Sequence, residues 1–364
     1  MVSLLPTLFA DIAALGGTCF YTGAAVRDML LGLPAHTTHE VLFYGITFED
    51  LGLVCTHHSG SFDPKSHTFS HSSGTFVFHR ITGIHDLVDL TTININSIYI
   101  NCVSGAVYDP HRAVSALKTK ILELPKEAIL SSPRLIFQVS RLTVELEGGF
   151  SLGVNTWFNI YDNARVVQHI DPNTLREELN AILLLDKPGP VLRLLHDLRV
   201  IEYILPELSA CANVIQSKRS GIRNVFDHVM YALDACEKDI ALRLTILFHD
   251  IGKPQTLEVG ADSKIHFFKH EQVGRDVAKR YLKYWGYDKD TINKVTQLVL
   301  HHMFDADPRL TDKSVRRLIK KVGKEYIYDL IKIREADRLG TPDKISMKKI
   351  KLLKKKIDRE IGNV

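Results

Sequence analysis

Residues 247–254 read LFHDIGKP, and this stretch ends an apolar segment with a histidine and an aspartate side by side. The glycine, lysine and proline that follow are typical of the end of a helix. Imidazole and carboxylate groups are both metal ligands. An apolar helix that ends on two such side chains predicts a metal site, and its other ligands must come from elsewhere in the chain.

Further candidate ligands of the same chemical types occur on both sides of His249 and Asp250. His228 lies 21 residues before His249, and His270 lies 21 residues after it. Asp337 lies in a later predicted helix. Neutral imidazoles and carboxylates suit divalent transition ions such as Mn²⁺, Fe²⁺, Co²⁺ or Ni²⁺. The ordered set therefore predicts a centre for one or two such ions.

Two adjacent histidines, His301 and His302, end the predicted helix 291–302 and offer one more ligand. Consecutive side chains on a straight helix point in different directions, so we expect only one of them to reach the centre. We prefer His301. Lys253, just beyond the end of the apolar helix, could offset the charge of a phosphate group.

The composition is that of an ordinary soluble protein with two or three domains. The chain has 364 residues, of which 45% are apolar and 24% are charged. Its five cysteines are scattered without a CxxC pair, so we expect neither a disulfide framework nor a cysteine zinc site. No signal peptide or membrane-spanning segment is evident, and we expect a cytoplasmic protein.

Positive charge is concentrated at the C-terminal end. The net charge is +4, yet residues 313–364 contain 17 Lys and Arg against 7 Asp and Glu. A basic end on a mildly acidic body suits a polyanion such as RNA. The alternative is a solvated helical tail without a polyanionic partner.

The chain divides into a mixed N-terminal part and a helical remainder. β-branched and aromatic stretches predict strands at 18–22, 40–46, 75–80 and 95–101, and a loop rich in Ser, His and Gly is expected at 57–74. Beyond residue 113, apolar patterns separated by Pro and Gly predict a series of helices, with a possible strand region around 256–268. These helices are expected at 175–185, 190–200, 225–236, 240–248, 272–284, 291–302 and 313–321.

Residues 23–32, GAAVRDMLLG, resemble the GGxVRDxLLG signature of CCA-adding tRNA nucleotidyltransferases and bacterial poly(A) polymerases. The later segments around Asp109-Pro110 and 204–208 also resemble that family. The resemblance implies an α+β nucleotidyltransferase-like head at 1–125 and a helical neck and body at 126–212. An HD domain at 213–340 and a basic helical tail at 341–364 would follow, giving a mainly α protein.

The head departs from the family pattern where the family's catalysis takes place. Nucleotidyl transfer needs two close carboxylates that hold Mg²⁺ ions. The family has them shortly after the LLG, whereas this chain offers at best Thr38 and Glu40. The Arg-Arg-Asp of the second motif is replaced by Leu90-Thr91-Thr92. We therefore expect the head to be inactive in nucleotidyl transfer.

The order H…HD…H…H…D resembles the HD phosphohydrolase superfamily. The resemblance implies metal ligation by His228, His249, Asp250, His270, His301 and Asp337, with His249, Asp250 and Lys253 as catalytic residues. HD domains fused to nucleotidyltransferases are known as 2′,3′-cyclic phosphodiesterases and phosphatases, which predicts nucleotides or RNA ends, including tRNA, as substrates. The alternatives are a working CCA-adding enzyme and a non-catalytic RNA-binding module. The sequence leaves the oligomeric state open.

Overall fold

A computed structural model describes residues 5–89, 92–215, 224–260, 265–304, 311–340 and 348–362. The chain forms two compact units, residues 1–135 with 146–159, and residues 136–145 with 160–364. The predicted fold class, a mixed head followed by helices, is confirmed. The finer domain boundaries at 125, 212 and 340 stay predictions, and residues 341–347 of the expected tail lie outside the described residues.

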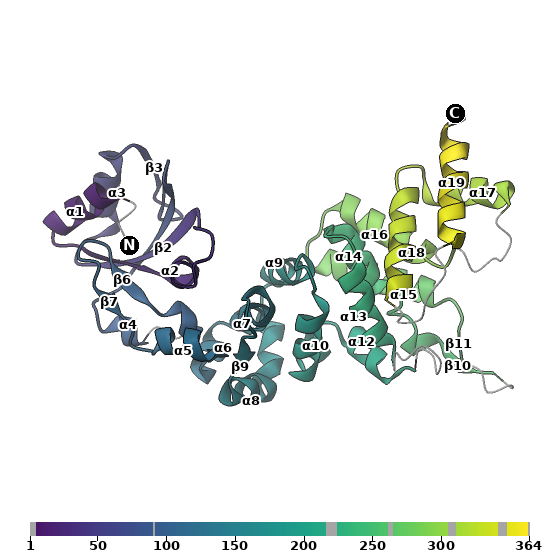
Figure 1. Cartoon of the computed structure of the whole chain (residues 1–364), viewed down its shortest axis with the longest axis horizontal. Helices are drawn as coiled ribbons and strands as arrows, with labels where there is room; N and C mark the ends of the chain where they lie inside the picture. The colour runs from purple at the N-terminus through teal and green to yellow at the C-terminus, as the bar shows by residue number, and fades with distance from the viewer. Residues whose placement is uncertain are drawn as a thin grey trace. The chain divides into compact units, whose positions relative to one another are not determined.

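The first unit contains one mixed sheet with short helices (Figure 1). Its strand order is β3-β4-β5-β2-β1-β6-β7, and the β2–β5 pair is its parallel pair. A separate two-stranded pair joins β8 to β9. The elements are α1 (Pro6–Ala14), β1 (Thr18–Thr22), α2 (Gly23–Leu30), β2 (Thr38–Tyr44), α3 (Phe48–Thr56), β3 (Gly60–Asp63), β4 (Thr68–His71), β5 (Gly74–Arg80), α4 (Asp86–Asp89), η1 (Asn94–Asn96), β6 (Tyr99–Asn101), β7 (Val107–Tyr108), α5 (Ala113–Thr119), β8 (Ile121–Leu122), α6 (Lys126–Ser131) and β9 (Ser151–Leu152).

Two sequence predictions for this unit were wrong in part. The expected loop at 57–74 contains β3 and β4, whose register pairs Phe62 with Phe69. Each of these strands has a single large apolar residue, too few to produce a recognisable alternation. The expected strand at 95–101 begins as the 3₁₀ turn η1, because the side chain of Asn94 bonds to backbone groups and holds that turn.

The second unit is helical apart from one hairpin, and most of its helices match the predicted ones. Its elements are α7 (Leu135–Glu145), α8 (Val154–Asn163, which begins in the first unit), η2 (Ala164–His169), α9 (Pro172–Leu183), α10 (Gly189–Asp197), α11 (Val200–Ile204), α12 (Pro206–Ala210), η3 (Cys211–Asn213), α13 (Val225–Ala235), α14 (Ile240–Phe248), η4 (Pro254–Thr256), β10 (Leu257–Val259), β11 (Ile265–Phe267), α15 (His270–Tyr284), α16 (Lys289–His301), α17 (Asp312–Val322), α18 (Ile327–Leu339) and α19 (Lys348–Gly362).

Helix α14 lies at the centre of the second unit. Every residue from 241 to 248 is buried, including Arg243 and Thr245, as expected for a largely apolar helix that is surrounded by other elements. Asp239 caps its start by accepting a hydrogen bond from the Leu242 backbone N–H. The helix packs against α9, α13, α15, α16 and α18, which brings its C-terminal end into the middle of the unit (Figure 1).

Glycines allow the chain beyond α14 to pass very close to the start of α15. A Cβ on Gly252 would lie 2.3 Å from the backbone oxygen of His270. A Cβ on Gly274 would lie 3.0 Å from the backbone oxygen of Phe248. Any side chain at residue 252 would therefore push the two segments apart, and the metal-capable residues that they carry would separate.

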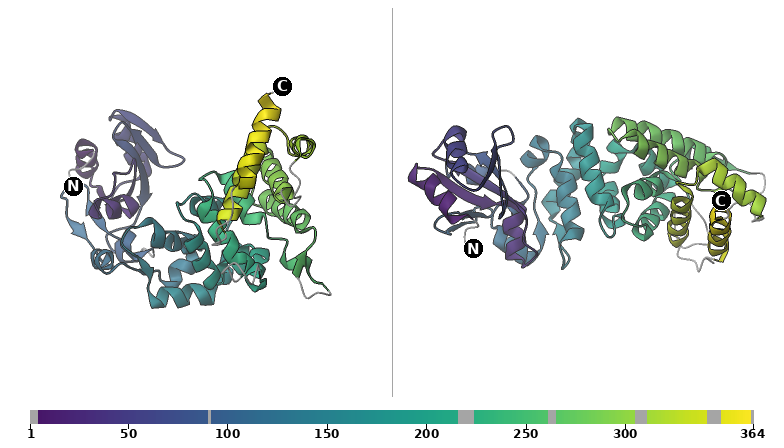
Figure 2. Two further views of the ribbon diagram at one scale, coloured as in Figure 1. Left: turned by 45° about the vertical axis from the view of Figure 1, so that its right-hand side comes forward. Right: turned by 90° about the horizontal axis from the view of Figure 1, so that it is seen from above.

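The C-terminal helices form the basic end of this unit. Helix α19 packs against α17 and α18, as Figure 2 shows for the yellow helix at the C-terminus. Part of the positive charge is paired locally, since Lys356 bonds to Asp312 at 2.5 Å and Arg316 to Glu360 at 2.9 Å. No described helix is long and apolar enough to span a membrane, and all five cysteines are free.

Arg243 ties α14 to the end of α9. Its side chain is 1% exposed, and its guanidinium donates to the backbone oxygens of Leu183 and Leu185. It also donates to the oxygen of Cys236 at 2.9 Å and to that of Glu237 at 3.0 Å. The planar fork of an arginine can serve several carbonyl groups at once, whereas a lysine ammonium cannot reproduce this arrangement.

We expect Arg243→Ala to lower the free energy of unfolding by about 3–5 kcal/mol, because it leaves several buried carbonyl oxygens without donors. Arg243→Lys should recover only a small part of that loss. Urea denaturation followed by circular dichroism measures both. The control is Arg316→Ala, which removes an exposed ion pair and should cost less than about 1 kcal/mol. An equal loss for the two alanine variants would contradict the role of Arg243.

Candidate metal centre

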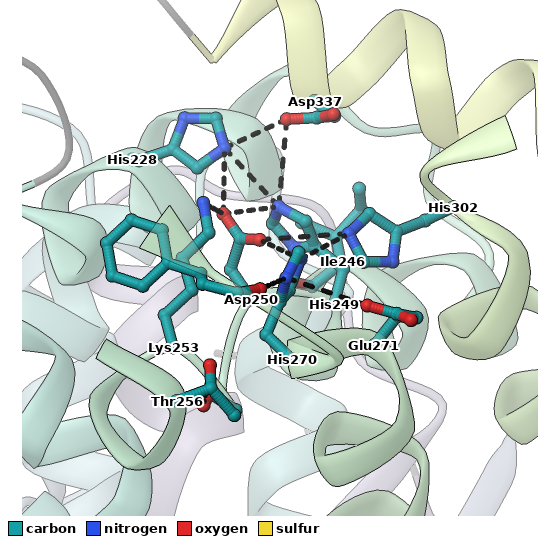
Figure 3. Close-up of polar contacts among 12 residues, drawn as sticks. His228, Ile246, His249, Asp250, Lys253, Thr256, His270, Glu271, His302 and Asp337 are labelled. Atoms are coloured by element: carbon teal, nitrogen blue, oxygen red, sulfur yellow. Dashed lines mark hydrogen bonds and ion pairs between the residues drawn. The ribbon is translucent and has the colours of Figure 1, made fainter. Parts of the chain in front are cut away.

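Five segments bring six metal-capable side chains to the end of α14 (Figure 3). The residues are all buried. His228 comes from α13, His249 and Asp250 follow α14, His270 begins α15, His302 follows α16, and Asp337 lies near the end of α18.

The first group of ligand atoms comprises His228, His249 and Asp337. The Nε2 atom of His228 lies 2.9 Å from Oδ1 of Asp337 and 3.3 Å from Nε2 of His249. The Nε2 atom of His249 lies 3.7 Å from the same Asp337 oxygen. These three atoms surround a single point from three different helices.

The second group comprises Asp250, His270 and His302. The Nε2 atoms of His270 and His302 are 3.2 Å apart, and they lie 3.5 and 3.7 Å from Oδ1 of Asp250. The other oxygen of Asp250, Oδ2, lies 3.3 Å from Nε2 of His249. Asp250 therefore presents one carboxylate oxygen to each group and connects the two.

Backbone carbonyls orient three of the four histidines. The Nδ1 atoms of His249, His270 and His302 lie 2.6, 2.8 and 2.7 Å from the carbonyl oxygens of residues 246, 267 and 299. A carbonyl oxygen only accepts, so each Nδ1 carries the hydrogen. In the neutral ring the inward Nε2 then bears a lone pair, which is the tautomer that binds metals.

The geometry fits divalent ions. Two neutral Nε2 atoms at 3.2 Å would repel each other through their lone pairs unless a cation lies between them. Ligand atoms about 2.1 Å from one ion lie about 3.0–3.4 Å from each other in octahedral or tetrahedral arrangements. The distances within both groups span 2.9–3.7 Å. Nitrogen and carboxylate donors together suit a divalent transition ion.

Electrostatics also favours a cation in this pocket. Burial would raise the pKa of Asp250, but His249 and Lys253 lower it well below the usual value. Burial likewise opposes a charge on His249, yet the carboxylates of Asp250 and Asp337 outweigh it and raise its pKa to about 10. The two buried carboxylates thus require positive charge, which a proton on His249 or a bound ion can supply.

Two basic residues support the carboxylates. The ammonium group of Lys253 donates to Oδ2 of Asp250 at 2.6 Å and lies 5.3 Å from the centre of the Phe267 ring. Arg334 donates to Oδ2 of Asp337, which leaves Oδ1 turned toward the histidines. The sequence analysis had named Lys253 but missed Arg334. Its spacing of three residues from Asp337 on one helix was the signal that could have found it.

The structure corrects the choice between the two histidines after α16. His302 belongs to the second group, whereas His301 belongs to neither. His301 is the last residue of the helix, and its ring is half-buried on another side. His302 follows the helix end, where its Nδ1 bonds to the Val299 carbonyl and its Nε2 turns inward. The phase of the helix decides this, because His302 continues the buried face formed by Val295, Leu298 and Val299, and that helical spacing could have been read from the sequence.

His228 differs from the other histidines. Its Nδ1 is buried and has no hydrogen-bond partner among the described residues. Its Nε2 lies at hydrogen-bond distance from Asp337. Two further basic residues, near His270 in the sequence, do not join the cluster: Arg275 bonds to Asp276 at 2.9 Å, and Lys269 is exposed with a left-handed backbone.

The signature of the first unit holds a structural ion pair. Arg27 donates to Asp28 at 2.5 Å and to the side chain of Asn96 at 2.9 Å, and both charged residues are buried. Glu40 pairs with His79 across the parallel strands β2 and β5. Among the residues that the structure describes, this unit has no group of three metal-capable side chains.

Two segments of the chain match known protein families. Residues 225–341 match the family described as HD domain, and residues 149–211 match "Probable RNA and SrmB- binding site of polymerase A". Over these two segments the chain is similar to an RNA-binding region of poly(A) polymerases and to HD domains. The six clustered residues all lie within the HD domain match.

Curated relatives resemble the chain at modest identity. A CC-adding tRNA nucleotidyltransferase of Thermus thermophilus is 28% identical over 254 residues, covering 65% of this chain and 56% of that protein. A Multifunctional CCA protein of Tolumonas auensis is 27% identical over 266 residues, covering 65% of this chain and 63% of that protein. The chain thus spans less than two thirds of the length of these relatives.

Solved structures of CCA-adding enzymes share the fold. An apo form of a CCA-adding enzyme matches with a TM-score of 0.67 at 14% identity, covering 99% of this chain and 82% of that one. The Thermotoga maritima CCA-adding enzyme complexed with tRNA matches with a TM-score of 0.61 at 15% identity, covering 97% of this chain and 81% of that one. At this level of identity the comparison establishes the fold alone.

The two ligand groups predict a difference between adjacent histidines. We expect the wild type to bind two equivalents of Mn²⁺ or Co²⁺, and His302→Ala to lose one of them, because His302 supplies one of the three ligands of the second group. Metal analysis after dialysis and titration calorimetry measure this. His301→Ala is the matched control and should bind as the wild type does. Loss of an ion from His301→Ala with retention by His302→Ala would reverse the assignment.

Proposed function

We propose that the chain is a metal-dependent phosphohydrolase whose site lies in the HD domain. The observation that carries the proposal is the bridging position of Asp250 between two groups of buried ligand atoms. His228, His249, Asp250 and Asp337 would hold one divalent ion, and Asp250, His270 and His302 a second. Ions held there would supply Lewis-acid chemistry, lowering the pKa of water and screening the charge of a phosphoryl group.

The residues around the two ligand groups would orient the ligands and bind the substrate. The carbonyls behind His249, His270 and His302 hold the ring nitrogens inward. Arg334 fixes the orientation of the Asp337 carboxylate. Lys253, which is largely buried beside Asp250, adds a positive charge next to the place where an anionic substrate would lie.

The substrate that we favour is a phosphodiester of a nucleotide or of an RNA end, in particular a 2′,3′-cyclic phosphate. Hydrolysis adds one water and breaks one P–O bond, leaving a phosphate monoester on one of the two ribose oxygens. The relation to tRNA-processing proteins and the match at 149–211 support an RNA or nucleotide partner, including tRNA. The basic helices α17 and α19 would add phosphate contacts that are sensitive to salt.

Nucleotidyl transfer by the first unit is a second candidate, and the names of the relatives favour it. They are called CC-adding tRNA nucleotidyltransferase and Multifunctional CCA protein. In this chain Glu40 remains as a carboxylate on the strand where the family's pair is expected, beside Gly23 with its positive φ. A third possibility, binding of RNA without turnover, would leave both assays below without product.

We expect the wild type to hydrolyse 2′,3′-cyclic AMP in the presence of Mn²⁺, Co²⁺ or Ni²⁺. His249→Ala should lower the rate by about 10³-fold or more, because His249 is a ligand and adjoins the bridging Asp250. Product release measured by chromatography follows the reaction. His301→Ala, which leaves both groups intact, should retain the wild-type rate. Hydrolysis that survives in His249→Ala at the wild-type rate would refute the proposal.

For the second candidate, the expected result is incorporation of labelled CTP or ATP at the 3′ end of a tRNA that lacks its terminal nucleotides. Glu40→Gln should abolish it, since it removes the remaining carboxylate at the motif position. His249→Ala serves as the control here, because it leaves the residues of the first unit unchanged and should not affect incorporation. Absence of incorporation by the wild type with Mg²⁺ would exclude this activity.

A further inference from the structure

A two-stranded hairpin connects two residues of the candidate metal centre. The hairpin begins just after Lys253 and η4, and it ends shortly before His270. Strands β10 and β11 pair with each other and with no other described strand. An isolated hairpin gains little stability by itself in water. The stability of the fold therefore does not account for the hairpin and its exposed side chains.

The returning strand β11 and the turn after it carry two aromatic rings that stack on each other. The rings of His266 and Phe268 have centroids 5.2 Å apart and are inclined by 9°. Phe268 is 61% exposed, more than any other Phe, Tyr or Trp side chain among the described residues. A stacked pair whose outer ring is largely exposed resembles the aromatic surfaces on which proteins stack nucleic-acid bases.

The pair adjoins the metal centre through the backbone. Phe268 lies two residues before His270, and two residues of chain span at most about 7 Å. The intervening Lys269 is exposed and has a left-handed backbone with φ of 63°, so the chain turns sharply there. Phe267 lies between the two stacked residues in the sequence. Its ring lies against the ammonium group of Lys253, and its backbone carbonyl accepts a hydrogen bond from Nδ1 of His270.

We propose that His266 and Phe268 form a stacking platform for a nucleobase that flanks the phosphoester held at the metal centre. This deepens the proposed hydrolase function and rests on it for the position of the phosphate. Stacking tolerates every base, because each has a flat π face. The platform therefore selects substrates that carry a base without selecting the identity of the base.

Charge and shape favour a nucleotide over other occupants. The exposed Lys269 directly follows Phe268 and suits a phosphate-bearing partner. A second copy of the chain would instead bury a broad apolar area, whereas Glu258 and His266, a polar cross-strand pair, face each other in the middle of the hairpin. A planar base covers one ring without covering that pair.

The test uses the full-length protein loaded with Mn²⁺ and compares two substrates. One is 2′,3′-cyclic AMP, and the other is glycerol 1,2-cyclic phosphate, which has the ester but no base. Phe268→Leu should raise KM for the first by about 5- to 150-fold, the range expected for loss of one base stack. The KM for the second, and kcat for both, should stay unchanged. Phe268→Tyr, which keeps the ring, should restore KM.

A binding experiment keeps the platform testable if hydrolysis itself fails. The probe is 2-aminopurine riboside 2′,3′-cyclic phosphate, whose fluorescence falls when its base stacks. We expect quenching by the wild type and by Phe268→Tyr but not by Phe268→Leu. Tyr284→Leu, which removes a ring that is 59% exposed at the far end of α15, is the control and should quench normally. A second probe carries the same base and cyclic phosphate at the 3′ end of a short oligoribonucleotide. Comparing the affinities for the two probes shows whether the platform binds a free nucleotide or an RNA end.

Several results would overturn the platform. Equal changes in KM for the two substrates would show that Phe268 supports the metal centre and does not bind the base. Quenching by Phe268→Leu at the wild-type affinity would show that the base lies elsewhere. A change from dimer to monomer in Phe268→Leu, seen by sedimentation, would assign the surface to a second copy of the chain. Quenching without hydrolysis would retain the platform and refute only the hydrolase.

Discussion

The second unit depends on one constraint, which is that Asp250 must offer its two oxygens to two different groups of histidines. One oxygen lies 3.3 Å from His249 and the other 3.5 Å from His270. A carboxylate in this position is fully buried and would be costly to ionise by itself. Lys253 and the imidazoles lower that cost, and the pKa of Asp250 is held well below its usual value.

The helices around Asp250 are arranged so that this constraint can be satisfied. Helix α14 is buried along its length, so its end lies in the interior and the residues that follow it are surrounded by other helices. Gly252 and Gly274 then let α15 approach closely enough for His270 to reach the carboxylate. Arg243 anchors the other end of α14, so the energetics of the helix and the geometry of the centre are linked through one rigid element.

Much of this arrangement could be predicted from sequence because its signals are local. The largely apolar pattern at 240–248 predicted the bounds of α14, and the spacing of His228, His249 and His270 predicted three of the six side chains that cluster at its end. Two features were not predicted. His302 and not His301 turns inward, because it continues the buried face of α16 after Val295, Leu298 and Val299, and this helical spacing was present in the sequence. The pair β3–β4 was missed, because Phe62 and Phe69 are too few for an alternating pattern.

The two units retain their sequence signatures for different physical reasons. In the first, Arg27 and Asp28 form a buried pair that also bonds to Asn96, so these residues can persist for stability alone. In the second, imidazole nitrogens of buried histidines face one another at 3.2–3.3 Å beside two buried carboxylates. That arrangement would weaken a core that held no cation, since a packed apolar cluster would be more stable. Its presence is therefore better explained by cation binding than by folding, whereas folding alone accounts for the Arg27–Asp28 pair of the head.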